Sequence, residues 1–395
     1  MKVQAMGKRA AIIVLDGVGI GAARDAAEYG DIGSDTLGHV VATMPAGELE
    51  NFREVGLANI RPFKGFAPVP NPLGAFGAME PSAAGKDSTT GHWEIAGVRI
   101  DVPFPTFPDG FPAEVLREFS RLTGRSVIGN VVGSGTDVIA RFGEEHVRTG
   151  AWVVYTSADS VFQVAAHEDA VPLAELYAAC ETARAMLSPP NEVSRVIARP
   201  FVGIPGAFRR SANRRDFSVE PPRETLLDAL QSAGIARNGV GKVDDLFAGR
   251  GIRAQHTSGN GEGIELISTW LTNGPKTGFL FANLVDFDQL YGHRNDVSGF
   301  SGALREFDAA LPSLRCALRE EDLLFITADH GNDPTTDSSD HARENVPVVA
   351  LGPSIRAGSA IGLRPTFADL GATIADWFGL DFRGAGTSFL AHIVR

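Results

Sequence analysis

Three short apolar segments that run into acidic and histidine side chains constrain the fold of this chain most strongly. Residues 10–15, 278–285 and 323–326 have the length and composition of buried strands. The polar residues that follow them are Asp16, Asp288, His293, Asp329 and His330. Because the carboxyl ends of parallel strands meet at one edge of an α/β sheet, we expect these side chains to lie close together. The sequence therefore predicts an α/β fold with a polar site at that edge.

The residue types at these strand ends favour a metal site. Carboxylate oxygens mixed with imidazole nitrogens suit Mn²⁺ or Zn²⁺ better than Ca²⁺, which prefers oxygen alone. His341, which follows the third segment, brings the set to three carboxylates and three imidazoles. Six such ligands are enough for two metal ions, which can clamp the attacking and leaving oxygens of a phosphoryl transfer. For a single Asp-His pair the alternative is a solvated loop in which the Asp caps a turn.

The glycine-rich turn after the first segment can also be interpreted as a nucleotide-binding motif. Residues 16–22 read DGVGIGA, and G-x-G-x-x-A after a strand is similar to a dinucleotide-binding fingerprint. However, the charge of Asp16 would face the pyrophosphate, and residues 24–31 are too polar for the helix that should follow. We therefore interpret Asp16 as a candidate metal ligand.

A run of hydroxyl residues indicates a nucleophile. Residues 85–95 read GKDSTTGHWEI, and the hydroxyls stand where a helix is expected to begin. Free backbone N–H groups and the helix dipole favour an anion there. An ordinary N-cap needs only one hydroxyl, which is the alternative. Three hydroxyls beside Lys86 suggest a phosphorylated nucleophile with neighbours that hold phosphate.

The chain is too long for one typical domain, and its amino-acid composition changes at two places. Its 395 residues predict two domains. Four prolines lie within residues 103–112, and after Pro221-Pro222 the predicted helices and strands alternate again as in an α/β fold. We expect a metal-binding core formed by residues 1–102 and 220–395, interrupted by a smaller α+β cap at 103–219. The cap carries a local group of arginines: Arg195, Arg199, Arg209, Arg210, Arg214 and Arg215.

Local patterns predict further elements. Helices are expected near 112–124, 173–187, 223–232, 263–271, 306–319 and 366–378, and strands at 127–132, 152–155, 195–203 and 346–351. The helix at 306–319 is expected to be interrupted near Pro312. Residues 35–80 predict one helix and a Gly/Pro-rich stretch.

Charge and cysteine use exclude several partners. The formal net charge of −12 argues against a nucleic-acid groove or an anionic membrane surface. Cys180 and Cys316 are the only cysteines, and both lie in apolar-periodic segments that predict buried thiols. Neither a disulfide framework nor a membrane span is expected, so the sequence predicts a cytoplasmic protein.

Five motifs together resemble the bacterial phosphopentomutases, a family of the alkaline phosphatase superfamily. The resemblance runs nearly end to end and is most specific in the second motif. The motifs begin at residues 16, 85, 155, 286 and 327 and read DGVGIG, GKDSTTGHWE, YTSADS, DFDQLYGHR and TADHGND. The resemblance implies an alkaline-phosphatase-like core, with a central mostly parallel sheet, and an inserted cap. It also implies interconversion of ribose or deoxyribose 1-phosphate and 5-phosphate with two Mn²⁺ ions, and activation by a sugar bisphosphate such as glucose 1,6-bisphosphate.

Carried over by motif, the resemblance implies a role for each candidate residue. Asp288, His293 and His341 would bind one metal ion, and Asp16, Asp329 and His330 the other. Ser88 would carry the phosphoryl group, at a position that holds Thr in most members of the family, with Thr89 as the alternative. Asp159 would contact the sugar, Arg195 and Arg210 the distal phosphate, and Lys242 is a further candidate for substrate binding.

Rival functions remain within and beyond this superfamily. A metal-dependent phosphatase or a cofactor-independent phosphoglycerate mutase would use similar ligands, and the large cap favours a mutase over a phosphatase. A metal- or phosphate-binding protein without activity is the rival from another class. It would have lost a ligand or the nucleophile, and every one of them is present.

Overall fold

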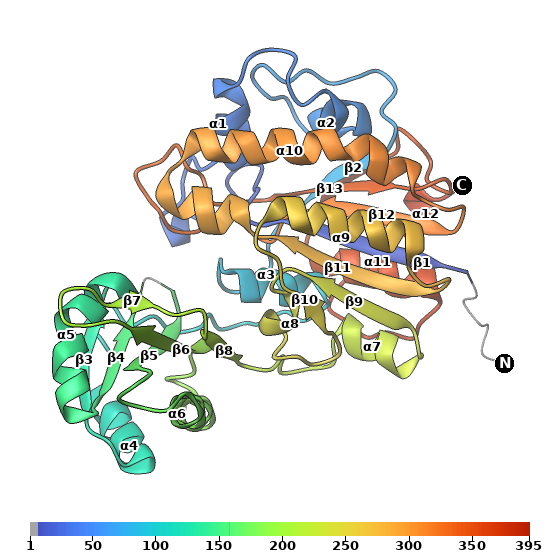
Figure 1. Cartoon of the computed structure of the whole chain (residues 1–395). Helices are drawn as coiled ribbons and strands as arrows, with labels where there is room; N and C mark the ends of the chain where they lie inside the picture. Colours follow the sequence, from blue (N-terminus) through green and yellow to red (C-terminus); the bar gives the residue numbers. More distant parts are fainter. Residues whose placement is uncertain (1–6, 158) are drawn as a thin grey trace. The chain divides into compact units, whose positions relative to one another are not determined.

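The computed structural model describes residues 7–157 and 159–395. The chain divides into two compact units, each with its own sheet (Figure 1). The first unit joins the residues up to Val102 to Pro221–Arg395, and the second is Pro103–Glu220.

The first unit is built on an eight-stranded, mostly parallel sheet with the order β10-β9-β11-β1-β12-β13-β2-β14. Its strands are β1 (Arg9–Leu15), β2 (Ala75–Met79), β9 (Ala236–Val240), β10 (Ala254–Gln255), β11 (Gly278–Leu284), β12 (Asp322–Thr327), β13 (Val346–Leu351) and β14 (Ala360–Arg364). β9, β11, β1 and β12 run parallel, whereas β13 is antiparallel to both of its neighbours. The strands β1, β11 and β12 are buried throughout, as expected for apolar runs at the centre of a sheet.

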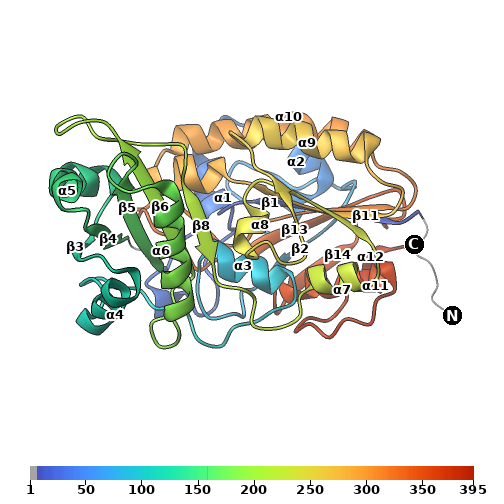
Figure 2. The ribbon, with the colours of Figure 1, turned by 60° about the horizontal axis from the view of Figure 1, so that its bottom comes forward.

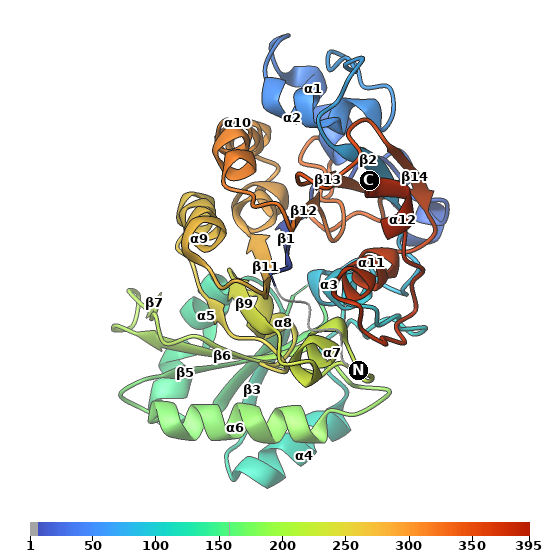
Figure 3. The same ribbon diagram turned by 90° about the vertical axis from the view of Figure 1, so that its right-hand side faces the viewer.

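Helices cover both faces of this sheet. They are α1 (Thr36–Thr43), α2 (Glu50–Val55), α3 (Ser88–Ile95), α7 (Leu226–Ser232), α8 (Val243–Leu246), α9 (Asn260–Asn273), α10 (Val297–Cys316), α11 (Ala368–Phe378) and α12 (Leu390–Ile393). The helices α9 and α10 lie on one face, and α3 and α11 lie on the other (Figure 3). Short 3-10 turns at Ala26–Tyr29, Leu57–Asn59 and Gly292–Arg294 and a π-helical turn at Phe287–Tyr291 complete the unit.

Three sequence-based expectations are wrong in this unit. α10 begins earlier than expected and continues through Pro312, because apolar residues on both sides of the proline, Leu311 and Leu314, are buried on the same helix. Residues 35–80 contain the strand β2, which pairs with β13 and β14. Cys316 is exposed at the last position of α10, whereas Cys180 is buried as expected.

The second unit has a mixed sheet with helices on both faces. Its elements are α4 (Ala113–Thr123), β3 (Val127–Val132), α5 (Gly135–Thr149), β4 (Trp152–Thr156), β5 (Val161–His167), α6 (Leu173–Met186), β6 (Arg195–Val202), β7 (Arg209–Arg210) and β8 (Arg215–Ser218). The strand order is β3-β4-β5-β6-β7, and β8 also pairs with β6, along which α6 runs (Figure 2). α4 and α6 pack on one face of the sheet and α5 on the other.

The topology of the first sheet brings distant segments to one edge. β1, β11 and β12 end at the same edge because they are parallel and in register. β13 is antiparallel to β12, so the residues that precede Val346 arrive at that edge as well.

Among the residues that the structure describes, no helix is both long enough and apolar enough to span a membrane.

Candidate active site

The first group of candidate ligands gathers where β1 and β12 end. Asp16 follows β1 directly, and Asp329 and His330 follow β12. Potential ligand atoms of these three buried residues all lie within 4.8 Å of one another. The His330 Nε2 atom is 3.3 Å from Asp16 Oδ1 and 3.4 Å from Asp329 Oδ2. The Gly17 backbone N–H donates to Asp329 Oδ1 (3.1 Å), so the glycine turn after β1 also orients the second carboxylate.

The second group gathers around Asp288, which stands in the π-helical turn after β11. The Nε2 atoms of His341 and His293 are 3.2 and 3.4 Å from the Asp288 carboxylate. The rings of His330 and His341 have centroids 4.1 Å apart, so the two groups adjoin. Asp288, His330 and His341 also satisfy the 4.8 Å distance for a shared ion, which makes His330 a possible member of either group.

Ser88 faces the first group from the start of α3. The N-cap of this helix is Asp87, whose side chain accepts from the Thr90 N–H (3.1 Å) and the Thr90 hydroxyl (2.6 Å). Because Asp87 caps the helix, the Ser88 hydroxyl is not needed for capping. Its Oγ lies 3.2 Å from His330 Nε2, 3.5 Å from Asp16 Oδ1 and 3.3 Å from the Nζ of Lys242. No comparable side-chain contact is found for Thr89 among the described residues.

Lys242 reaches this site from the loop after β9. Its ammonium lies 2.8 Å from Asp16 Oδ2 and donates to Ser88 Oγ. Burial alone would lower the pKa of Lys242, but the carboxylates of Asp16, Asp288 and Asp329 raise it. Lys242 is therefore a fixed positive charge next to the serine hydroxyl.

The other pKa shifts show how strongly the site concentrates negative charge. Burial would raise the pKa of Asp16 and Asp288, but Lys242 and His330 beside Asp16, and His341 and His293 beside Asp288, hold both below the usual range. Burial would lower the pKa of His330, yet the nearby carboxylates raise it to about 10. The carboxylates of Asp16 and Asp288 are therefore ionised at neutral pH and attract cations.

The residues present fit divalent metal ions. The donor set is a mixture of carboxylate oxygen and imidazole nitrogen, which suits Mn²⁺ or Zn²⁺. Asp329 Oδ2 and His341 Nε2 are buried and form no hydrogen bond of good geometry within the described part of the chain. The attraction that raises the pKa of His330 would act more strongly on a divalent cation.

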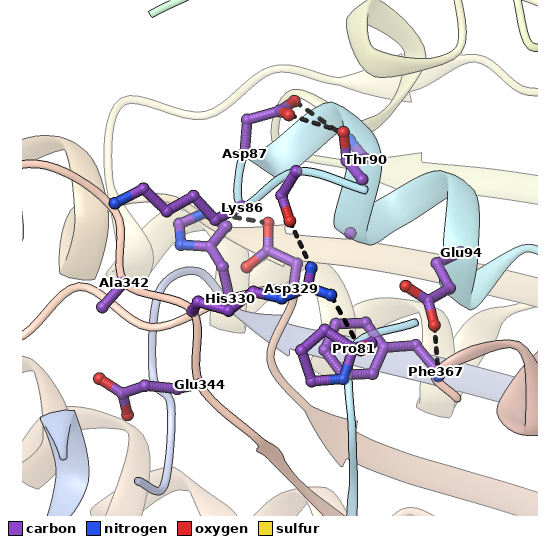
Figure 4. A pocket seen from close by; sticks show the side chains of 13 residues that line it. Pro81, Lys86, Asp87, Thr90, Glu94, Asp329, His330, Ala342, Glu344 and Phe367 are labelled. Carbon is purple, nitrogen blue, oxygen red and sulfur yellow. Dashed lines mark hydrogen bonds and ion pairs between the residues drawn. The ribbon is translucent and has the colours of Figure 1, made fainter. Parts of the chain in front are cut away.

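A pocket lies beside this arrangement, and its empty volume of about 250 Å³ includes space that is open to solvent (Figure 4). It is lined by the start of α3, by Asp329 and His330, and by residues 342–344. Glu94 on its wall accepts hydrogen bonds from the Ser82 N–H and hydroxyl (2.9 and 2.8 Å), the Thr366 hydroxyl (2.6 Å) and the Phe367 N–H (3.0 Å). Glu94 therefore braces α3 against the segment that leads into α11.

Two residues that support the ligands were not singled out from the sequence. His92 of α3 has its Nδ1 2.9 Å from the Ser88 carbonyl oxygen and 3.1 Å from Asp329 Oδ2. The Asn332 amide donates to Asp288 Oδ1 (2.8 Å). Both residues lie inside motifs that resemble those of the phosphopentomutases, and this position in the motifs was the sequence signal that could have identified them.

The cap candidates are only partly brought together. Arg195 begins β6, and its guanidinium is 3.9 Å from Asp159 Oδ2 and 3.5 Å from Asp216 Oδ2. Arg210 is exposed on β7 and pairs with Phe201, near the other end of β6. The structure thus places Asp159 and Arg195 side by side. The backbone of Arg210, on the neighbouring strand β7, lies near the opposite end of β6 from Arg195.

Comparisons with known proteins agree with the fold and with the motifs. Residues 8–382 match the family model of the metalloenzyme superfamily. The phosphopentomutase of Caldanaerobacter subterraneus subsp. tengcongensis is 52% identical over 387 residues, covering 98% of each chain. That of Desulfitobacterium hafniense is 50% identical over 388 residues, covering 98% of this chain and 100% of the relative. A solved phosphoglycerate mutase of Leishmania mexicana is similar in fold, with a TM-score of 0.50, 14% identity, and coverage of 100% of this chain and 99% of that chain. The expected alkaline-phosphatase-like α/β fold is confirmed.

Proposed function

The chain belongs to the metalloenzyme superfamily and, within it, to the phosphopentomutases, isomerases by their reaction, and on this premise we propose that it interconverts ribose or 2-deoxyribose 1-phosphate and 5-phosphate. The proposal includes a phosphorylated Ser88 and a sugar bisphosphate intermediate at a site for two Mn²⁺ ions. The observation that carries it is the Ser88 hydroxyl, which lies within hydrogen-bonding distance of His330, Asp16 and Lys242.

The proposed ligand sets follow the two groups at the strand ends. Asp288, His293 and His341 would hold one ion, and Asp16, Asp329 and His330 the other. When bound, the divalent ions would act as Lewis acids that offset the charge of the phosphoryl group and lower the pKa of the Ser88 hydroxyl. The proximity of the two groups supports this assignment.

The chain's own groups then account for the transfer. The phosphoryl group leaves Ser88 Oγ as the P–Oγ bond breaks, and a bond to the free hydroxyl of the sugar phosphate forms. The sugar hydroxyl gives up its proton, and Ser88 Oγ takes one up. The Lys242 ammonium, 3.3 Å from Ser88 Oγ, stabilises the charge that develops on this oxygen. The resulting bisphosphate reorients and returns its other phosphoryl group to Ser88, which restores the phosphoenzyme.

The phosphoserine would also be stabilised by the helix that carries it. Ser88 is the first residue of α3, where backbone N–H groups and the dipole favour a negative charge. Asp87 takes the Thr90 N–H, which leaves the earlier amides of the turn for the phosphate. This local arrangement supports Ser88 over Thr89 as the acceptor.

The cap would hold the rest of the substrate. We assign Asp159 to the sugar hydroxyls and Arg195 and Arg210 to the phosphate that is not reacting. Arg195 is already paired with Asp159 and Asp216, whereas Arg210 forms no ion pair among the described residues. Arg210 therefore has its full charge available for phosphate. The proposed partner is a small sugar phosphate, and a cytoplasmic location remains a prediction from cysteine use.

A coupled assay tests the function directly. Ribose 1-phosphate is supplied with Mn²⁺ and a catalytic amount of glucose 1,6-bisphosphate, and ribose 5-phosphate and inorganic phosphate are measured in parallel. We expect ribose 5-phosphate to form without phosphate release. Stoichiometric release of phosphate would identify a phosphatase instead.

Mass spectrometry tests the nucleophile. After treatment with glucose 1,6-bisphosphate, we expect one added phosphate on Ser88, absent in Ser88→Ala. Ser88→Thr should retain activity, and Thr89→Val serves as the matched control because it removes the neighbouring hydroxyl at nearly constant volume. A phosphate on Thr89, or turnover by Ser88→Ala, would show that the nucleophile is misassigned.

A further inference from the structure

Glu344 is a buried carboxyl group that the proposed chemistry does not use. It precedes β13 and is only 1% exposed. Burial raises the pKa of Glu344 to about 7, although hydrogen bonds from Gly21 and Thr36 act in the opposite direction. Keeping such a group in the interior costs free energy, so its place in the fold calls for a physical reason.

Two glycines form a cradle around this side chain. A Cβ atom on Gly331 would lie 2.5 Å from Glu344 Cδ, and one on Gly19 would lie 2.7 Å from Glu344 Cβ. Gly331 directly follows His330, and Gly19 lies in the turn after Asp16. The loops after β1 and β12, which carry three of the proposed ligands, therefore close on Glu344 from two directions. The close approach of Glu344 therefore explains why Gly19 is a glycine, within the turn that is similar to a dinucleotide-binding fingerprint.

The carboxylate is then bonded to two further segments. The Gly21 N–H donates to Oε2 (3.0 Å), and the Thr36 N–H donates to Oε2 (3.0 Å) and Oε1 (3.2 Å). The Thr36 hydroxyl donates to Oε1 (2.7 Å). Because Thr36 is the first residue of α1, Glu344 ties the turn after β1 to the start of this helix.

The Thr36 hydroxyl extends this network to the second ligand group. Its single proton goes to Glu344, so its oxygen accepts from the Asn332 N–H (3.0 Å). The Asn332 side-chain amide in turn donates to Asp288 Oδ1 (2.8 Å). A continuous chain of hydrogen bonds thus runs from Glu344 through Thr36 and Asn332 to Asp288.

We propose that Glu344 is a positioning residue for the metal centre, fixing the loops after Asp16 and His330 and orienting Asp288 through Thr36 and Asn332. The inference rests on the proposed two-metal function. It assigns the unusual burial of Glu344 to metal binding rather than to the stability of the core alone. Partners of this kind, one step behind the ligands, contribute about 10–100-fold to metal affinity.

The test changes Thr36, because Glu344→Ala would leave the Gly21 and Thr36 amides without acceptors and could prevent folding. Thr36→Val removes the hydroxyl at nearly constant volume, and Thr36→Ser keeps it. Thr43→Val is the matched control, since the Thr43 hydroxyl on the same helix donates only to the Val40 carbonyl (2.7 Å). Mn²⁺ binding to the chelated full-length protein is measured by isothermal titration calorimetry and by electron paramagnetic resonance.

We expect Thr36→Val to bind Mn²⁺ about tenfold more weakly, with an unchanged circular dichroism spectrum. Its turnover should be low at limiting Mn²⁺ and recover with excess Mn²⁺, while KM for the sugar phosphate stays the same. Thr36→Ser and Thr43→Val should resemble the wild type. If Thr36→Val binds Mn²⁺ as tightly as a wild type that binds two ions, the inference is wrong and the proposed function stands. If the wild type itself binds no Mn²⁺, the two-metal proposal fails, and the inference with it.

Discussion

Replacing His92 tests how the nucleophile and the metal ligands are held together. His92 is fully buried on α3 and stacks on Phe281, with ring centroids 5.4 Å apart. Its Nε2 accepts from the Asn283 amide (3.3 Å), which leaves the proton on Nδ1. That proton points at the Ser88 carbonyl oxygen (2.9 Å), and Nδ1 is also 3.1 Å from Asp329 Oδ2. One ring therefore links the backbone of the proposed nucleophile to a proposed metal ligand.

The expected loss can be worked from these contacts. His92→Phe keeps an aromatic ring against Phe281 but removes both nitrogens, so the apolar packing changes little. The hydrogen bond from His92 to the Ser88 carbonyl joins two uncharged groups and contributes about 0.5–1.5 kcal/mol. At 1.4 kcal/mol for each factor of ten, kcat/KM should fall by roughly twofold to twelvefold. His92→Asn is the control, because its amide can reach the place of Nδ1 and should recover part of the loss.

The assay follows ribose 5-phosphate formation across a range of Mn²⁺ concentrations, and circular dichroism confirms that each variant is folded. We expect kcat to fall in His92→Phe because the Ser88 carbonyl loses its hydrogen-bond donor, and the apparent Mn²⁺ affinity to fall because Asp329 loses the imidazole nitrogen that lies 3.1 Å from its carboxylate. Unchanged values of both in a folded His92→Phe would refute the reasoning, and His92 would then be a packing residue only.

Three further predictions concern other parts of the site. Asp329→Asn should abolish most turnover and lower the bound metal measured by elemental analysis, while the melting temperature changes little, because ligands at strand ends contribute little to the core. Arg210→Ala should lower kcat/KM for the sugar phosphate about tenfold to a hundredfold, from the ~1.5–3 kcal/mol of a charge-assisted hydrogen bond, with metal content and Ser88 phosphorylation unchanged; an unaffected kcat/KM would place the phosphate on another arginine. The pKa of Glu344 is raised from 4.5 to about 7, so its contribution to stability is fully present below pH 4.5 and is lost as the pH rises through 7. In thermal unfolding of the chelated wild type, the free energy of unfolding should therefore fall by about 3 kcal/mol between pH 4.5 and 7, and this fall should be absent in Glu344→Gln. Equal pH profiles for the two proteins would contradict the raised pKa.

The strand-end residues could be predicted from the sequence because they depend on local patterns. An apolar run of strand length followed by Asp16, or by Asp329 and His330, indicates both a buried strand and a polar turn. In a parallel sheet those turns must share an edge, and the structure has them there. The family was likewise recognisable from motifs alone, since residue identity at fixed spacing needs no coordinates.

Other parts of the site depend on strand pairing that no local pattern reports. His341 and Glu344 reach the edge because β13 runs antiparallel to β12, and Lys242 reaches it because β9 lies next to β11. A strand's own sequence shows that it is buried but not which neighbour it pairs with or in which direction. The network through Glu344, Thr36 and Asn332 joins residues about three hundred positions apart and could not be foreseen.

The same distinction explains the expectations that were wrong. A proline inside a helix is unfavourable locally, yet α10 continues through Pro312 because burial of Leu311 and Leu314 outweighs the lost hydrogen bond. Apolar periodicity predicted a buried Cys316, whereas the end of α10 leaves it exposed. The sequence by itself determined which segments form strands and which chemistry they carry, since both follow from near neighbours along the chain. Tertiary structure alone decided which of those groups meet, because long-range packing selects among pairings that are locally equivalent.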